Sequence, residues 1–154
     1  MQHTLREAEK HLAERRHAEC LACAADALKH LLHRPQRAHQ PHMTARALSL
    51  RGAARCLLGQ HRIAHAELAE AVAAAENLGR LGVAHDQHLT LAGALSDLSV
   101  NAIVLERYDE ADDSLRRGDF MLKRAYRPCT AARAALRHNR GLLEFARGDM
   151  EAAF

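Results

Sequence analysis

Aromatic residues are scarce in this chain, and tryptophan is absent. Two Tyr and three Phe account for 3% of the 154 residues. β-Branched residues are also few, and no run alternates Val, Ile or Thr with polar residues as a half-buried strand would. The lack of strand patterns argues against a sheet-based fold.

Long apolar segments are absent as well. No segment approaches the about 18 consecutive apolar residues that a transmembrane helix needs, and the first seven residues have no apolar stretch after a basic start. We therefore expect no membrane association, no signal peptide and a cytoplasmic location. The four cysteines, Cys20, Cys23, Cys56 and Cys129, form no dense framework, which favours reduced thiols over disulfides.

Charge of a single sign does not dominate any part of the chain. The 22 Lys and Arg are interspersed with 19 Asp and Glu, for a formal net charge of +3. Proteins that bind nucleic acids usually gather their positive charge on one face. We therefore expect no nucleic-acid partner.

Alanine and leucine dominate what is present. Apolar residues make up 48% of the chain, and 32 residues are Ala. Alanine has the highest helix propensity and allows helices to approach closely. The composition therefore predicts an all-α fold with a core large enough for one domain.

A pattern repeats along the whole chain. Small residues that begin the second helix of a pair fall at Cys20, Ala64, Ala111 and Ala153, with spacings of 44, 47 and 42. A period of this length is typical of stacked helical hairpins. It predicts about seven helices in antiparallel pairs, with repeats at 4–35, 43–79, 84–125 and 129–154. The last repeat is incomplete, so we expect a fragment of a longer protein.

The boundaries within these repeats follow from turn and capping signals. Gly59 predicts a turn after a helix at 44–58, and the prolines and polar residues of 35–42 predict a loop. No Gly or Pro marks a turn near residue 16, so the first repeat is either a sharply bent hairpin or one long helix. Arg51 and Arg55 occupy positions where a buried Leu and an aromatic residue are expected.

The repeat resembles the tetratricopeptide repeat family. The residues that carry the resemblance best are Leu95, Leu98, Ser99, Ala102, Tyr108, Ala111, Leu115 and Gly118. The period exceeds the family's usual length of about 34 residues and is similar to longer variants in bacterial regulators. The resemblance implies a right-handed α-solenoid whose concave groove binds a protein segment. It also implies a larger bacterial signalling regulator, with a diguanylate cyclase or transcription-regulating output domain.

The first helices of the pairs are expected to line this groove. Ser49, Ala53 and Gly93 fall on the same face. The predicted groove residues are Asp97, Val100, His138, Asn139, Leu142 and Phe145. In the resembled family, an Asn in the place of Asn139 often hydrogen-bonds a peptide backbone, and Asp97 holds the equivalent place one repeat earlier.

Chemistry other than binding has little support in the sequence. No phosphate-binding Gly-rich loop, nucleophile elbow or zinc-enzyme motif is present, so we expect no enzyme and no cofactor. The twelve His leave one alternative, a metal-responsive helical protein. Its candidate ligands are His61 and His65, which are four residues apart on one helix, together with clusters such as His17, Cys20 and Cys23.

The end of the chain predicts self-association. Because the last repeat is incomplete, Leu136, Leu143 and Phe145 are expected to lack part of their cover. Uncovered apolar patches mark association sites. We therefore expect a homodimer through the C-terminal repeat.

Overall fold

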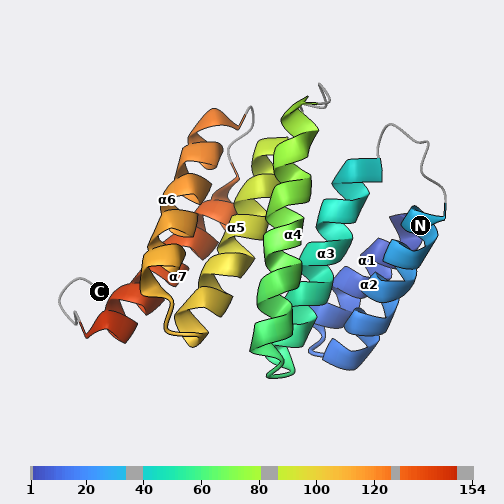
Figure 1. Cartoon of the computed structure of the whole chain (residues 1–154), viewed down its shortest axis with the longest axis horizontal. Helices are drawn as coiled ribbons and strands as arrows, with labels where there is room; N and C mark the ends of the chain where they lie inside the picture. Colours follow the sequence, from blue (N-terminus) through green and yellow to red (C-terminus); the bar gives the residue numbers. More distant parts are fainter. Residues whose placement is uncertain (1, 34–39, 81–86, 126–128, 149–154) are drawn as a thin grey trace.

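The computed structural model describes residues 2–33, 40–80, 87–125 and 129–148. Within these ranges the chain forms seven α-helices and no strand (Figure 1). The helices are α1 (Gln2–Ala13), α2 (His17–Leu32), α3 (Gln40–Leu57), α4 (His61–Arg80), α5 (Gln87–Val104), α6 (Tyr108–Arg124) and α7 (Thr130–Arg147). The prediction of an all-α fold is confirmed.

Three turns with the same hydrogen bonds join α1 to α2, α3 to α4 and α5 to α6. Each contains one residue with positive φ, namely Arg15 at 60°, Gly59 at 77° and Glu106 at 60°. The N–H of the following residue donates to the carbonyl five residues earlier, as Gln60 does to Arg55 at 2.8 Å. This is the Schellman motif that commonly ends helices. The first repeat is therefore a hairpin, and its turn places an Arg where glycine is the usual residue.

Gly148 ends α7 with a φ of 87°, so the left-handed residues of the described part of the chain, Arg15, Gly59, Glu106 and Gly148, repeat with the period seen in the sequence. Three of the four small anchor residues, Cys20, Ala64 and Ala111, are fully buried. The fourth, Ala153, lies outside the described residues. The sequence period thus corresponds to a repeated turn followed by a buried small residue.

The start of α3 differs from the prediction. The helix begins at Gln40 and includes Pro41, where the sequence predicted a loop that extends to residue 42. Proline is well suited to the first turn of a helix, because the N–H that it lacks has no partner there. The prediction that Pro41 lies in a loop is therefore wrong, because this proline lies in the first turn of α3.

The helices pack in sequence order along the molecule. Each helix contacts the next, and α1 also contacts α3, α3 contacts α5 and α5 contacts α7. Among the described residues the backbones of α2 and α4, and those of α4 and α6, do not come into contact. Side chains still join α4 to α6, because His65 lies against Glu110 and Glu76 pairs with Arg117. Figure 1 shows α1 and α2 at the N-terminal end of the row and α6 and α7 at the opposite end. The odd-numbered helices therefore form one continuous layer.

Glycines allow two of the helix pairs to approach closely. A Cβ added at Gly52 would lie 2.6 Å from Cγ and 2.7 Å from Cδ2 of Leu68, and one at Gly118 would lie 3.0 Å from Cδ2 of Leu136. The leucine side chains occupy the space above the glycines. Gly52 of α3 and Leu68 of α4 thus pack directly against each other.

Arg51 and Arg55 lie where the sequence led us to expect apolar core residues. Their side chains are about a quarter exposed, and the Nε atoms of both lie 3.0 Å from Oε1 of Glu67, which is 7% exposed. A buried carboxylate needs such partners, because an unpaired buried charge is costly. One acidic residue of α4 therefore compensates two basic residues of α3.

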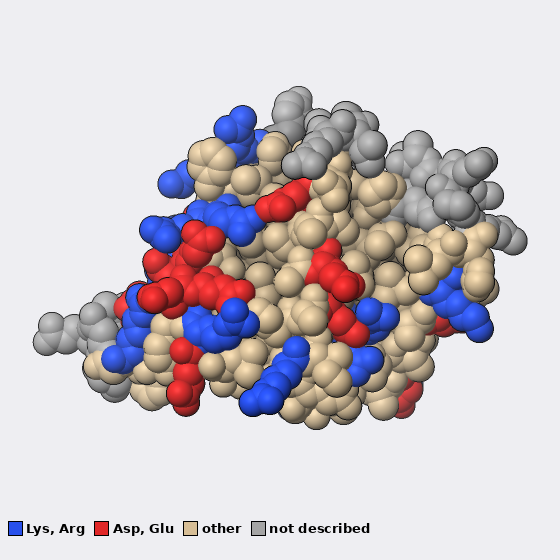
Figure 2. Space-filling model, in the orientation of Figure 1, with Lys and Arg blue, Asp and Glu red and all other residues tan. Residues whose placement is uncertain are grey.

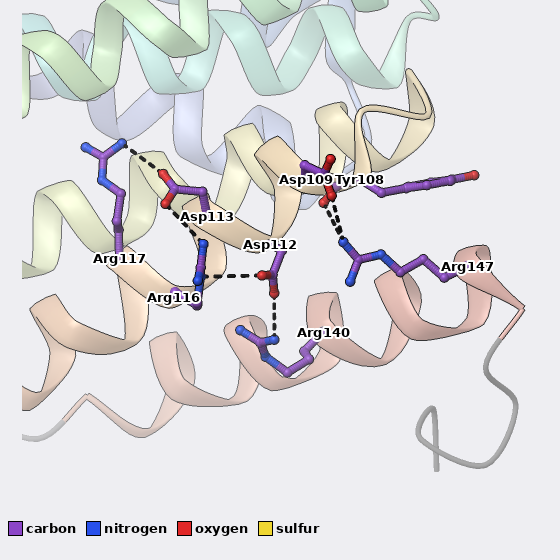
Figure 3. A network of polar contacts seen from close by, with 8 residues as sticks. All are labelled: Tyr108, Asp109, Asp112, Asp113, Arg116, Arg117, Arg140 and Arg147. Carbon is purple, nitrogen blue, oxygen red and sulfur yellow. Dashed lines mark hydrogen bonds and ion pairs between the residues drawn. The ribbon is translucent and has the colours of Figure 1, made fainter.

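Ion pairs also join α6 to α7, on the surface. Arg140 Nη1 lies 3.0 Å from Oδ1 of Asp112, and Arg147 Nη2 lies 3.4 Å from Oδ1 of Asp109 (Figure 3). Figure 2 shows acidic and basic side chains intermixed over this part of the molecule. Exposed pairs of this kind contribute little to stability individually. Within the described ranges, no helix is both long enough and apolar enough to cross a bilayer.

Candidate functional site

A cavity of about 440 Å³ opens where α1, α3 and α5 meet. Its apolar lining residues are Leu12, Leu50, Ala53, Leu89, Gly93 and Ala94. Its polar lining residues are Glu9, His42, Arg46, Ser49, Thr90 and Asp97. Volumes of this size are typical of ligand sites, which are mostly apolar with a few well-placed polar groups.

Small residues keep the cavity open. A Cβ added at Gly93 would meet no atom within 4 Å, in contrast to the crowded Gly52. Ala53 and Ala94 on neighbouring helices also contribute only a methyl group each. The space therefore arises because α3 and α5 present small side chains where they meet α1.

Two polar pairs lie in the cavity wall. Arg46 of α3 donates from Nε to Oε1 of Glu9 on α1 at 2.6 Å, so these two charges compensate each other. Nδ1 of His42 lies 3.0 Å from Oγ1 of Thr90 on α5. Both pairs connect different helices, and they stabilise the junction that forms the cavity.

Asp97 differs from these paired residues. It is partly buried, and it has no hydrogen bond or ion pair with any other described residue. Burial raises the pKa of its carboxyl group from the ordinary 3.8 to about 7, because removal from water disfavours the charged form. A carboxyl group with such a pKa in a concave site is a candidate for ligand binding.

The cavity brings together only some of the predicted groove residues. Asp97 lines it, as do Ser49, Ala53 and Gly93 from the same predicted face. Val100, His138, Asn139, Leu142 and Phe145 are not among its lining residues. His138, Leu142 and Phe145 are exposed on α7 and Val100 is partly buried on α5, so their role in a groove stays a prediction.

The amide of Asn139 is engaged inside the fold. This residue is 5% exposed, and its Nδ2 donates to the carbonyl and hydroxyl oxygens of Ser96 at 3.1 and 3.0 Å. It also donates to Oγ of Ser99 at 3.3 Å. These bonds join α7 to α5. Hydrogen bonding of Asn139 to a peptide backbone stays a prediction, and the structure gives its amide nitrogen a packing role.

The sequence analysis missed Glu9, Leu12, His42, Arg46 and Thr90 as cavity residues. Two of them belong to α1, whose separation from α2 was left open because no Gly or Pro marks the turn. His42 lies in the first turn of α3, which was predicted to be a loop. The two boundaries that the sequence did not resolve thus account for three of the missed residues, while Arg46 and Thr90 lie within predicted helices and were not assigned to the groove.

The candidate metal ligands His61 and His65 meet different partners. Nδ1 of His61 lies 3.5 Å from Sγ of Cys56 and 3.3 Å from Oδ1 of Asn101. Nε2 of His65 lies 2.7 Å from Nη1 of Arg107 and 3.2 Å from Oε1 of Glu110. In the part of the chain that the structure describes, no three His, Cys, Asp or Glu side chains are grouped so that they could hold a metal ion.

Cys56, His61 and Asn101 have the residue types of a cysteine hydrolase triad but a different geometry. In such a triad one ring nitrogen faces the thiol and the other faces the orienting amide. Here the thiol and the amide oxygen both approach Nδ1 of His61. Burial and, to a lesser extent, Asp97 raise the pKa of the Cys56 thiol, which disfavours a thiolate. The arrangement links three helices and does not activate a nucleophile.

Two of the residues predicted for self-association are buried. Leu136 is 2% exposed and Leu143 is fully buried, and both belong to the core cluster that α5, α6 and α7 share. The expectation that they lack cover is not met, because α6 and α5 already cover them. Phe145 is 56% exposed, so it is the one member of that set available to a partner. Dimerisation stays a prediction.

Comparison with known proteins returned no match to a family model, to a curated protein or to a solved structure.

Proposed function

We propose that this chain is a recognition module that binds a segment of another protein in the cavity between α1, α3 and α5. The observation that carries the proposal is this cavity of about 440 Å³, which is mostly apolar and contains one carboxyl group with no partner among the described residues. Apolar walls provide affinity for side chains, and a few polar groups fix orientation.

The proposal includes a right-handed solenoid of antiparallel pairs, as in tetratricopeptide repeats. Contacts between successive odd-numbered helices support it, as do the three Schellman turns at the repeat period. A stack of hairpins presents its first helices on a concave surface, and such surfaces typically bind other chains. The cavity is then one part of a groove that continues towards α7, where Leu142 and Phe145 are exposed.

By the same resemblance, we place the module in a larger bacterial signalling regulator with a diguanylate cyclase or transcription-regulating output domain. The reading frame beyond Phe154 tests this association, and a different kind of neighbouring domain would contradict it. The metal-responsive alternative has no specific observation in its favour among the described residues.

A peptide-display selection tests the binding function. A random library is selected on the natural protein and counter-selected on Gly93→Trp, whose indole would fill the cavity from a position with open space around it. The expected result is a set of peptides that bind the natural protein about tenfold or more tightly than Gly93→Trp.

Gly93→Ala is the matched control, because it introduces only one methyl group at the same position. Peptides selected on the natural protein should still bind it. If no selected peptide distinguishes the natural protein from Gly93→Trp while both variants remain helical by circular dichroism, the cavity is not a peptide site.

A further inference from the structure

The charges around the cavity compensate each other except at Asp97. Glu9 and Arg46 form an ion pair across the wall. Asp97 lies in the same lining but makes no hydrogen bond or ion pair with any other residue within the described ranges. After burial, the charge of Asp97 is the second cause that raises the pKa of the Cys56 thiol, which is an acidic group and not a cation. Among the described residues, the cavity lining therefore contains one acidic group without a basic partner.

An acidic group in this position is costly to the fold. The pKa of its carboxyl group is raised by burial, so the charged form is disfavoured in the empty cavity. A cation brought beside the carboxylate would reverse this, because an opposite charge at short range favours the ionised form. The cavity is thus electrostatically complementary to a positive group.

The rest of the lining fits a long aliphatic stem. Leu12, Leu50 and Leu89 come from three different helices and give the cavity apolar walls. Lysine and arginine side chains bury their methylene groups along apolar surfaces while the charged end meets a polar partner. An apolar passage with a carboxylate in its lining matches this distribution.

The geometry points to Asp97 as the anchor for a lysine or arginine side chain of the bound protein segment. This inference rests on the proposed function, and it adds the class of residue that the segment must contain. The methylene groups of that side chain pack against Leu12, Leu50 and Leu89, and its cationic end pairs with the carboxylate of Asp97. The hydroxyl group of Ser49, in the same lining, is available to the main chain of the segment, whereas that of Thr90 is paired with His42.

Two short peptides that differ by one charge test the anchor. The first is acetyl-Leu-Lys-Leu-amide, and the second carries an Nε-acetylated lysine, which keeps the stem and removes the charge. Binding is followed by nuclear magnetic resonance at about pH 8, above the pKa of about 7 at Asp97, through the amide signals of Thr90 and Gly93. We expect the charged peptide to bind about tenfold more tightly than the acetylated one.

Asp97→Asn should reduce this preference to about twofold or less, because the amide has no charge to pair with the ammonium group. Asp113→Asn is the matched control, since Asp113 is an exposed aspartate of α6 outside the cavity, and it should keep the preference. Thermal melting of both variants shows whether they are folded before binding is compared.

Equal binding of the two peptides, a preference that survives Asp97→Asn, or no binding of either peptide at the cavity signals would each overturn the basic anchor. The display selection separates this result from failure of the proposed function. If selected peptides depend on an open cavity but contain no shared Lys or Arg, the anchor is wrong and the binding function stands.

Discussion

Asp97 and Asn139 occupy the same place in successive helix pairs and have opposite surroundings. Each lies nine residues before a left-handed turn residue, Glu106 or Gly148. Asn139 is buried and gives its amide nitrogen to Ser96 and Ser99, whereas Asp97 lines a cavity and has no partner among the described residues. Buried polar groups that are satisfied stabilise a fold, whereas a carboxyl group that lines a cavity without a protein partner is a candidate for ligand binding. The comparison distinguishes a packing position from a binding position within one repeat pattern.

The largest expected effect comes from placing an aspartate, the residue at the binding position, at the packing position 139. Asn139→Asp replaces a donor by a carboxylate beside the carbonyl oxygen of Ser96. We expect a loss of about 3 kcal/mol of unfolding free energy at neutral pH, because a buried acceptor loses its donor and a charge is buried. Urea denaturation measures the change.

Asn77→Asp is the control for this substitution. It makes the same chemical change at an exposed position of α4 and should alter stability by less than about 0.5 kcal/mol. Equal denaturation midpoints for the two variants would show that the hydrogen bonds of Asn139 do not join α5 to α7 in solution.

The converse exchange, Asp97→Asn, should stabilise the protein. The pKa of Asp97 is about 7 in the folded state and near 3.8 when unfolded, so the folded state holds this proton more tightly. This contribution favours folding below about pH 4 and is lost as the pH rises through about 7. Asp97→Asn should therefore be more stable than the natural protein by about 2 kcal/mol at about pH 8, after discounting for partial exposure, and about equal at pH 4.

Denaturation at both pH values checks this prediction. Cys56, Glu9, His42 and Arg46 are the other titratable groups near the cavity, and all four are unchanged in the variant. Asp97 affects the pKa of Cys56 among these groups, but burial still raises that pKa above the ordinary 9.0 in the variant, so the thiol stays protonated at about pH 8 and at pH 4. A stability difference that does not depend on pH would contradict the raised pKa of Asp97.

Gly52 and Gly93 provide a second comparison, between a glycine whose surroundings are filled and one with open space around it. Gly52→Ala should destabilise the protein by about 2 kcal/mol, because its Cβ would overlap the Leu68 side chain at 2.6 Å. Gly93→Ala should stabilise it by about 0.5–1 kcal/mol, since its Cβ meets open space and alanine favours the helix. Thermal melting compares the two variants. A similar change in melting temperature for both would mean that α3 and α4 can separate to admit a methyl group.

The smallest expected effect concerns the turn between α5 and α6. Glu106 has a φ of 60°, which is strained for a residue with a side chain, and Gly59 occupies the equivalent place without strain. Glu106→Gly should stabilise the protein by about 0.5–1 kcal/mol. If differential scanning calorimetry shows a lower melting temperature instead, the Glu106 side chain contributes more than the backbone strain costs.

The sequence by itself determined the helical class, the period and the small anchor residues. Ala64 and Ala111 are buried as the pattern required, because helix propensity and amphipathic spacing are local properties that any chain segment carries. The place of Asp97 on the face of the first helices also followed from the repeat. These features depend on residues within one helix or one turn.

Tertiary structure alone decided which polar residues have partners. Arg51 and Arg55 are compensated by Glu67 of the next helix, and Asn139 is bonded to a helix about forty residues away in sequence. Asp97 has no such partner among the residues that the structure describes, and nothing in its neighbouring sequence indicates this. Hydrogen bonds and ion pairs between helices depend on distance in space, so the difference between a packing residue and a candidate site appears only when the helices are packed together.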